Sequence, residues 1–255
     1  MKIVHISDIH VAGPYFLPDL MDNVIKEINK IEPEILVVTG DLTQDGYPFE
    51  FHRAKGYIKR MKSKEIVVIP GNHDERNVGY LCFEEIFGPR SVVNKYKNIT
   101  IVGVDSAQPD IDEGHVGREK YEWIEHCLET DGFKVVALHH HLISVPKTGR
   151  ERNILIDAGD VLELLVRHGI DLVLCGHKHV PWIWNLNGMI VTNAGTACTQ
   201  STKWNIPPPS FNLIEIDEDE KEGMRMYRVY SRGEKKLVLE MDGEKATKYE
   251  SFGTF

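Results

Sequence analysis

Short, nearly continuous apolar runs recur along the first two thirds of the chain, and polar residues follow each of them at once. Five of these runs are rich in Val, Ile and Leu and cover residues 2–6, 35–38, 66–69, 135–138 and 172–175. Such runs are typical of strands buried on both faces of a sheet. Because ligands bind outside the carboxyl ends of strands in open α/β sheets, we expect the polar residues to gather at one edge.

Between these runs the apolar residues change to helical spacing. Four helices are predicted, at residues 17–31, 54–61, 121–128 and 159–168. After residue 176 the pattern changes to hairpins: residues 182–186 and 189–192 flank Asn187-Gly188, a pair that readily forms a type I′ turn. Residues 211–216 and 224–230 flank an acidic loop, and residues 236–240 follow. We expect these late strands to extend or face the first sheet, not to form a separate domain.

Composition narrows the class of protein. The 255 residues carry a net charge of -9 with a pI near 5.7, which speaks against a general nucleic-acid binder. The four cysteines, Cys82, Cys127, Cys175 and Cys198, include no Cys-x-x-Cys pair, so we expect buried free thiols. No apolar stretch has membrane-spanning length. A cleavable signal peptide would remove Asp8, which is the first of the candidate metal ligands described next. We therefore expect a cytoplasmic protein.

The residues that follow the five apolar runs are of metal-ligand types. They are Asp8-x-His10, Gly40-Asp41, Gly71-Asn72-His73-Asp74, His139-His140-His141 and Gly176-His177-Lys178-His179. Each motif alone has a plain structural explanation, as a turn, a solvated loop or a chance polar run. Their joint occurrence, in order and at strand ends, favours a metal site.

Two divalent ions about 3.5 to 4 Å apart need a carboxylate that bridges them and terminal ligands for each. Asp41 is the best bridge, because it ends a strand and follows a glycine that lets the backbone come close. Asp8 and His10 can converge on one ion, either in strict strand geometry or after leaving it beyond Ser7. His73 can ligate a metal or act as an acid, whereas His5, inside a strand, is predicted to be a satisfied core residue or a support of the metal ligands.

The ordered set resembles the signature of the calcineurin-like metallophosphoesterases, over about residues 1–200. Gly103-Val-Asp-Ser106, Gly117 with the helix of Trp123, and Asn193-Ala-Gly-Thr196 are similar to the class III cyclic nucleotide phosphodiesterase and glycerophosphodiesterase branch. That branch usually has His-His-Pro where this chain has His139-His140-His141. The resemblance implies an α/β fold, a four-layer αββα sandwich of two mixed sheets flanked by helices. We place one domain at residues 1–242, with the hairpins of about 182–240 completing the second sheet and a fraying tail at 243–255.

The resemblance also implies a dinuclear metal-dependent phosphodiesterase. One metal would be held by Asp8, His10, His179 and bridging Asp41, and the other by Asp41, Asn72, His139 and His177. A water or hydroxide that bridges the ions would attack phosphorus in line, and His73 would stabilise or protonate the leaving oxygen. The mixed nitrogen and oxygen ligands suit manganese, iron, cobalt or zinc better than magnesium.

The expected substrate is a small phosphodiester of cyclic nucleotide or glycerophosphodiester type. Asn72, His73, His140, Arg150 and Arg152 are the candidates for contacts with it, although a solvated basic loop explains the two arginines equally well. The alternatives are a phosphomonoesterase, a nuclease and a non-catalytic binding module. A phosphoprotein phosphatase would carry Asp-Arg-Gly after Gly-Asp, the acidic composition speaks against a nuclease, and the intact ligand set speaks against a binding module. Homo-oligomerisation stays open.

Overall fold

The computed structural model describes residues 1–146, 148, 153–199, 207–217, 223–243 and 245–249. Its strands form a seven-stranded sheet, in the order β13-β12-β11-β10-β1-β2-β3, and a six-stranded sheet, in the order β4-β5-β6-β7-β9-β8. The first sheet contains β1 (Lys2–Ile6), β2 (Ile35–Thr39), β3 (Glu65–Ile69), β10 (Ser210–Ile216), β11 (Gly223–Tyr230), β12 (Lys235–Asp242) and β13 (Lys245–Tyr249). The second contains β4 (Val92–Tyr96), β5 (Ile99–Val104), β6 (Phe133–Leu138), β7 (Leu172–Cys175), β8 (Trp182–Leu186) and β9 (Met189–Asn193).

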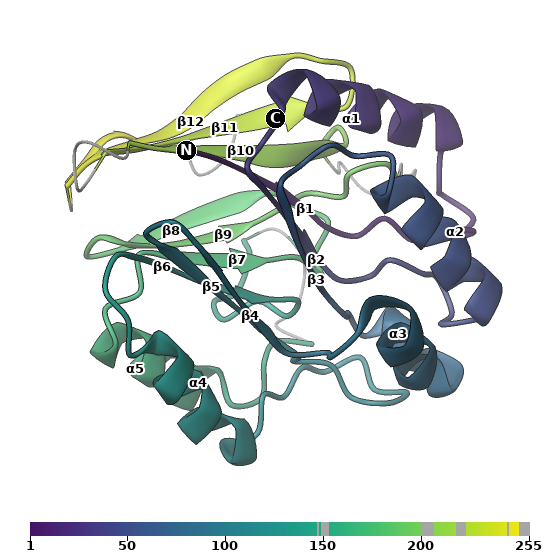
Figure 1. Ribbon diagram of the computed structural model, residues 1–255, viewed down its shortest axis with the longest axis horizontal. Helices are drawn as coiled ribbons and strands as arrows, with labels where there is room; N and C mark the ends of the chain where they lie inside the picture. The colour runs from purple at the N-terminus through teal and green to yellow at the C-terminus, as the bar shows by residue number, and fades with distance from the viewer. Residues whose placement is uncertain (147, 149–152, 200–206, 218–222, 244, 250–255) are drawn as a thin grey trace.

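The helices lie on the outer faces of the two sheets (Figure 1). They are α1 (Pro18–Ile31), α2 (Pro48–Ile58), α3 (Gly79–Phe87), α4 (Tyr121–Leu128) and α5 (Ala158–Arg167), with short 3-10 helices η1 (His73–Val78) and η2 (Arg118–Lys120). Helices α1, α2 and α3 pack on the seven-stranded sheet, and α4 and α5 pack on the six-stranded one. The four-layer αββα sandwich is confirmed.

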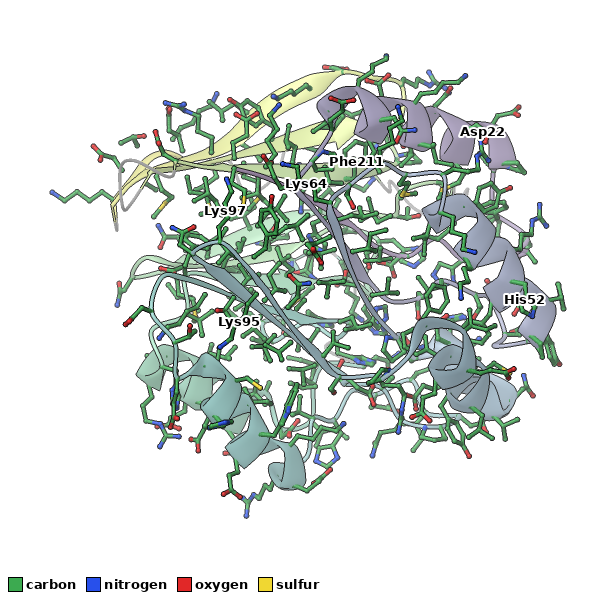
Figure 2. The ribbon with its side chains drawn as sticks, viewed as in Figure 1. Asp22, His52, Lys64, Lys95, Lys97 and Phe211 are labelled. Carbon is green, nitrogen blue, oxygen red and sulfur yellow. The ribbon has the colours of Figure 1, made fainter. Side chains whose placement is uncertain are left out.

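Three apolar clusters hold these layers together. Alternate residues of β1 point to opposite faces, so that Ile3 enters the cluster between the sheets while Val4 and Ile6 pack under the helices. Phe211 of β10 lies inside the helix-side cluster, whereas His52 projects from the outer side of α2 (Figure 2). Burial on both faces explains why the strands of the site are nearly continuous apolar runs.

The orientation of the strands positions the site. β1, β2 and β3 are mutually parallel, and so are β5, β6, β7 and β9. The carboxyl ends of parallel strands meet at the same edge of a sheet, so the polar residues after β1, β2 and β3 emerge together. The same holds for those after β6 and β7. The five predicted strands therefore bring their polar residues to one common edge. Three of these strands belong to the seven-stranded sheet and two to the six-stranded sheet.

The structure contradicts the expectation that all the late hairpins complete the second sheet. β8 and β9 lie in the six-stranded sheet, and Asn187 and Gly188 between them have φ angles of 52° and 100°, as a type I′ turn requires. However, β10 to β13 do not complete the second sheet: β10 pairs antiparallel with β1, so these strands extend the first, seven-stranded sheet. The tail is not wholly frayed, since residues 245–249 form β13.

Three further elements were missed, although one of them, β5, is a wholly buried and largely apolar run. The helix α3 and the strands β4 and β5 have no counterpart among the predicted elements. β4 is only half-buried and pairs with one neighbour at the end of its sheet, so its apolar content is low.

All four cysteines carry free thiols; Cys175 and Cys198 are buried, and Cys82 and Cys127 are half-buried. Within the described residues no helix is long and apolar enough to cross a membrane.

Candidate metal centre and active site

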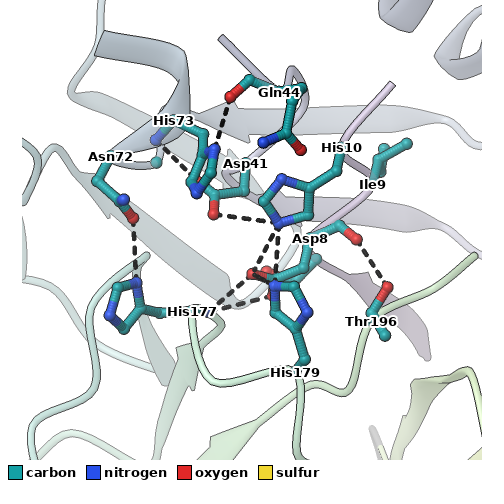
Figure 3. A network of polar contacts seen from close by, with 12 residues as sticks. Asp8, Ile9, His10, Asp41, Gln44, Asn72, His73, His177, His179 and Thr196 are labelled. Atoms are coloured by element: carbon teal, nitrogen blue, oxygen red, sulfur yellow. Dashed lines mark hydrogen bonds and ion pairs between the residues drawn. The ribbon is translucent and has the colours of Figure 1, made fainter. Parts of the chain in front are cut away.

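The structure brings all the predicted metal-ligand residues together at the edge where the strands end. Figure 3 labels all of them except His139. Asp8 and His10 follow β1, Asp41 follows β2, and Asn72 with His73 follows β3. His139 follows β6, while His177 and His179 follow β7. The seven-stranded sheet thus supplies the carboxylates, and the six-stranded sheet supplies three of the imidazoles.

Sharp turns after the strands aim these side chains. Asp8, His10, Asp41, His177 and His179 have φ angles of 54°, 48°, 52°, 74° and 55°, in the left-handed region that residues other than glycine rarely adopt. The chain therefore leaves strand geometry directly after Ser7, one of the two arrangements that the sequence allowed. Such strained conformations cost about 1–3 kcal/mol each and concentrate at functional sites.

Glycines let the turns approach one another. A Cβ atom on Gly71 would lie 2.2 Å from Asp41 Oδ1 and 2.4 Å from the backbone nitrogen of Asp41. Gly176 packs against Ser7 and Asp8 in the same way, with 1.9 Å between an added Cβ and Ser7 Oγ. A larger residue at either position would push the turn away from the carboxylate beside it.

We predict that Gly71→Ala lowers the free energy of unfolding by about 1–3 kcal/mol, the usual cost of overpacking, and weakens metal binding. Gly56→Ala in α2 is a matched control, because an added Cβ there meets nothing within 4 Å. It should stabilise the protein by up to about 1 kcal/mol through helix propensity. Chemical denaturation and metal analysis of both variants measure the difference. Equal stability of the two variants would contradict the packing argument.

The first group of donors consists of Asp8, His10, Asp41 and His179. His10 Nε2 lies 2.9 Å from His179 Nε2, 3.4 Å from Asp41 Oδ2 and 3.9 Å from Asp8 Oδ1. His179 Nε2 lies 3.2 Å from Asp8 Oδ1. The carboxylates and His10 are buried, and His179 is only partly exposed. Four donors therefore converge on one point.

The second group of donors faces the other oxygen of Asp41. Asp41 Oδ1 lies 3.4 Å from His139 Nε2. Asn72 Oδ1 lies 3.1 Å from His139 Nε2 and 3.0 Å from His177 Nδ1. The two oxygens of a single carboxylate thus face two different groups of donors.

The first histidine of the triple-histidine run is the one directed at this group. His139 Nδ1 donates to the carbonyl oxygen of Thr39 at 2.7 Å, which leaves Nε2 facing Asp41 and Asn72. His140 differs, because its Nδ1 contacts Ser106 Oγ and its Nε2 contacts the carbonyl oxygen of Asp112. Neither ring nitrogen of His140 is free for the substrate contact that the sequence predicted.

Burial and neighbouring charges set the protonation states of the donor groups. Burial opposes ionisation of Asp41, but the neighbouring imidazoles of His139, His73 and His10 hold its pKa well below the usual range. Burial lowers the pKa of His10 to about 3 against the attraction of Asp41, so this imidazole is neutral near pH 7. Burial also lowers the pKa of His177 well below its usual value. An ionised carboxylate and neutral imidazoles are the forms that bind divalent metals. Burial opposes protonation of His139 and His179 as well, but the charge of Asp41 raises the pKa of His139 to about 9 and that of Asp8 raises the pKa of His179. A metal that binds these two imidazoles therefore displaces protons from them.

Comparison with known proteins decides the family. The family model of the calcineurin-like phosphoesterases matches residues 1–181. The chain belongs to the calcineurin-like phosphoesterase family. This family uses divalent metals, and the chain is accordingly a metal-dependent phosphoric ester hydrolase.

Relatives of this calcineurin-like phosphoesterase include two bacterial proteins. This chain is 30% identical over 249 residues to a probable glycerophosphodiester phosphodiesterase of Arcobacter nitrofigilis, and the alignment covers 86% of this chain and 90% of that protein. It is 28% identical over 216 residues to a probable cyclic nucleotide phosphodiesterase of Xenorhabdus bovienii, covering 78% of this chain and 84% of that protein. The alignment with the Arcobacter protein extends well beyond the region matched by the family model.

Solved structures share the fold. A dimetal phosphatase from Danio rerio superposes with a TM-score of 0.70 at 12% identity, over 93% of this chain and 98% of that one. Vps29 from Entamoeba histolytica in complex with zinc superposes with a TM-score of 0.52 at 18% identity, over 96% of this chain and all of that one. At these identities the likeness concerns the architecture alone.

His73 stands at the edge of the phosphoesterase site without belonging to either group of donors. Its backbone nitrogen donates to Asp41 Oδ1 at 3.0 Å, and its Nδ1 contacts the carbonyl oxygen of Gln44 at 2.6 Å. A carbonyl oxygen only accepts, so Nδ1 carries a proton and Nε2 is the nitrogen left for the site. The His73 ring packs edge-on against His10, with 4.6 Å between the ring centroids.

Asp74 has a structural role that the sequence did not reveal. Its carboxylate accepts from the backbone nitrogens of Leu42, Thr43 and Gly71 at 3.1, 2.9 and 2.9 Å. Burial, together with the charge of Asp41, raises the pKa of Asp74 to about 6. Asp74 therefore joins the turn after β2 to the turn after β3. The only hint of this role in the sequence was its position directly after Asn72-His73.

The remaining histidines and arginines singled out in the sequence have different outcomes. His5 is buried and contacts Thr39 Oγ1 at 2.9 Å through Nε2, which confirms it as a satisfied core residue. His52 and His126 are exposed. Arg150 and Arg152 lie outside the described residues.

Proposed function

We propose that this phosphoesterase is a dinuclear phosphodiesterase that acts on a small diester of cyclic nucleotide or glycerophosphodiester type. The proposal rests on the carboxylate of Asp41, whose two oxygens face different groups of donors. Oδ2 faces His10, and Oδ1 faces His139. A carboxylate in that position suits a bridge between two ions. The relatives named for glycerophosphodiester and cyclic nucleotide hydrolysis support the substrate class.

The proposed ligands follow the two groups of donors. Asp8, His10, His179 and Asp41 would hold one ion, and Asp41, Asn72, His139 and His177 the other. When bound, two divalent ions would act as Lewis acids and lower the pKa of bound water. Histidine-rich mixed ligands favour manganese, iron, zinc or cobalt over magnesium. The cytoplasm remains the proposed location.

The chain's own groups would act on the substrate around this centre. His73 presents Nε2 beside Asp41 and is the proposed proton donor to the leaving oxygen. Asn72 would position the phosphoryl group next to it. Because Asp8, Asp41 and His139 are buried, little bulk water surrounds the reacting groups, and electrostatic interactions there are strengthened.

Charge at the rim favours a diester over a monoester. Arg76, just after the Asn72-His73 turn, already pairs with Asp112 at 2.9 Å and Asp45 at 3.6 Å. Its guanidinium is therefore neutralised by protein carboxylates and does not add a clamp for a dianionic phosphate. A diester carries one negative charge and depends less on such a clamp.

We predict that kcat/KM favours diesters over the corresponding monoesters by at least about tenfold, since one hydrogen bond to a charged group contributes about 1.5–3 kcal/mol. The measurement compares bis(p-nitrophenyl) phosphate with p-nitrophenyl phosphate, then cyclic nucleotides and glycerophosphodiesters, on wild type and on Arg150→Ala and Arg152→Ala. A preference for monoesters that collapses in either variant would instead establish a phosphatase. Two bound metal equivalents without hydrolysis of any ester would indicate a binding module.

A further inference from the structure

The orientation of the Asn72 amide decides whether the second group of donors is complete. Asn72 Oδ1 faces His139 Nε2 and His177 Nδ1 at 3.1 and 3.0 Å. Its Nδ2 points the other way and donates to Asp112 Oδ1 at 3.0 Å. A flipped amide would present its NH₂ group to the donors, and an NH₂ group has no lone pair available for a metal.

Asp112 lies on the segment of residues 105–117, which connects β5 to η2. His140 holds this segment from below: its Nε2 donates to the carbonyl oxygen of Asp112 at 3.2 Å, and its Nδ1 accepts from Ser106 Oγ at 2.9 Å. Ser106 Oγ in turn lies 3.2 Å from the backbone nitrogen of His140. A Cβ on Gly114 would come within 2.3 Å of His140 Cγ, so the segment lies directly against the ring.

The carboxylate of Asp112 is shared between two donors. Arg76 Nη2 donates to the same Oδ1 at 2.9 Å, so the negative charge at Asp112 is compensated at the rim of the site. The Asp112 side chain is 51% exposed, whereas Asn72 and His140 are buried. Nothing about core packing therefore requires an acid at position 112, and its hydrogen bonds account for its placement.

We propose that Asp112 is a positioning residue that keeps the Asn72 amide oxygen directed at the second metal, with His140 holding Asp112 in place. This inference rests on the proposed dinuclear function. It assigns His140 to the support of the 105–117 segment, in place of the predicted substrate contact. Partners of metal ligands typically contribute about 10- to 100-fold in metal affinity or activity.

The test is a calorimetric titration of Mn²⁺ into the full chain after removal of metal by a chelator. We expect Asp112→Ala to weaken binding of the second equivalent about 10- to 100-fold while the first equivalent binds as in wild type. Asp112→Asn should bind both equivalents nearly as wild type does, because its amide oxygen still accepts from Asn72. Glu113→Ala, which removes an exposed acid from the same segment, is the matched control and should change neither step.

Asn72→Ala separates the failure of this inference from the failure of the proposed function. If Asn72→Ala loses the second equivalent but Asp112→Ala keeps both, Asp112 is not a positioning residue and the dinuclear site stands. If Asn72→Ala itself keeps both equivalents at wild-type affinity, the ligand assignment is wrong. Equal weakening of both equivalents in Asp112→Ala, together with a lower unfolding temperature, would indicate a general role in stability and overturn the proposal.

Discussion

We expect Asp41→Asn to abolish turnover, with a loss of more than about 1,000-fold, larger than that for removing a single stabilising donor, and to lower the metal content. Asp41 is the residue whose two oxygens face both groups of donors, at 3.4 Å from His10 and 3.4 Å from His139. An asparagine in its place offers one oxygen and no charge, so two dications would be held with less compensation. The measurements are kcat/KM and metal content by elemental analysis.

Asp45→Asn is the matched control for the loss of charge. Asp45 lies on the same turn, is 47% exposed and contacts Arg76 rather than either group of donors. It should retain two metals and most of the activity. An Asp41→Asn protein with two metals and near-normal activity would show that the bridge is wrongly assigned.

His73→Ala should keep both metals but lose rate, by roughly 100- to 10,000-fold if His73 is a general acid. The contact of Nδ1 with Gln44 orients the ring, and Nε2 is left for the leaving oxygen. Removing a proton donor matters most for a poor leaving group. The loss should therefore be larger for an alkyl diester than for a p-nitrophenyl diester.

His73→Gln provides the comparison, because glutamine can donate a hydrogen bond but does not transfer a proton at neutral pH. It should resemble His73→Ala on the alkyl diester if proton transfer is the main contribution. His52→Ala, on the exposed side of α2, should leave all rates unchanged. Equal losses in His73→Ala on both kinds of ester would leave only a role in charge stabilisation.

Much of the site was predictable from local pattern. Asp8, Asp41 and His139 each follow a short apolar run of strand length, and a strand buried on both faces brings the polar residues after it to the edge of the sheet. Asn187-Gly188 defined its hairpin for a similar reason, since few residue pairs accept two positive φ angles. In these cases the residues carry the information in their own conformational and solvation preferences.

The sheet to which each strand belongs was decided only by the tertiary structure. β10 has the same apolar character as β9, yet β10 pairs with β1 while β9 pairs with β7. Backbone hydrogen bonding is alike for both partners, so the choice depends on which pairing buries the most side-chain surface. That quantity exists only when distant segments come together.

The individual roles of adjacent polar residues were likewise decided by contacts distant in sequence. His139 and His140 are neighbours of identical type, and the carbonyl oxygens of Thr39 and Asp112 give them different tasks. Asp112 shows no signal in its own segment, because its importance comes from the amide of Asn72, 40 residues earlier in the chain. The sequence by itself determined which residue types reach the edge, since solvation and strand geometry act locally. The folded chain determined which nitrogen or oxygen each residue directs at the metals, since hydrogen-bond partners are set by packing.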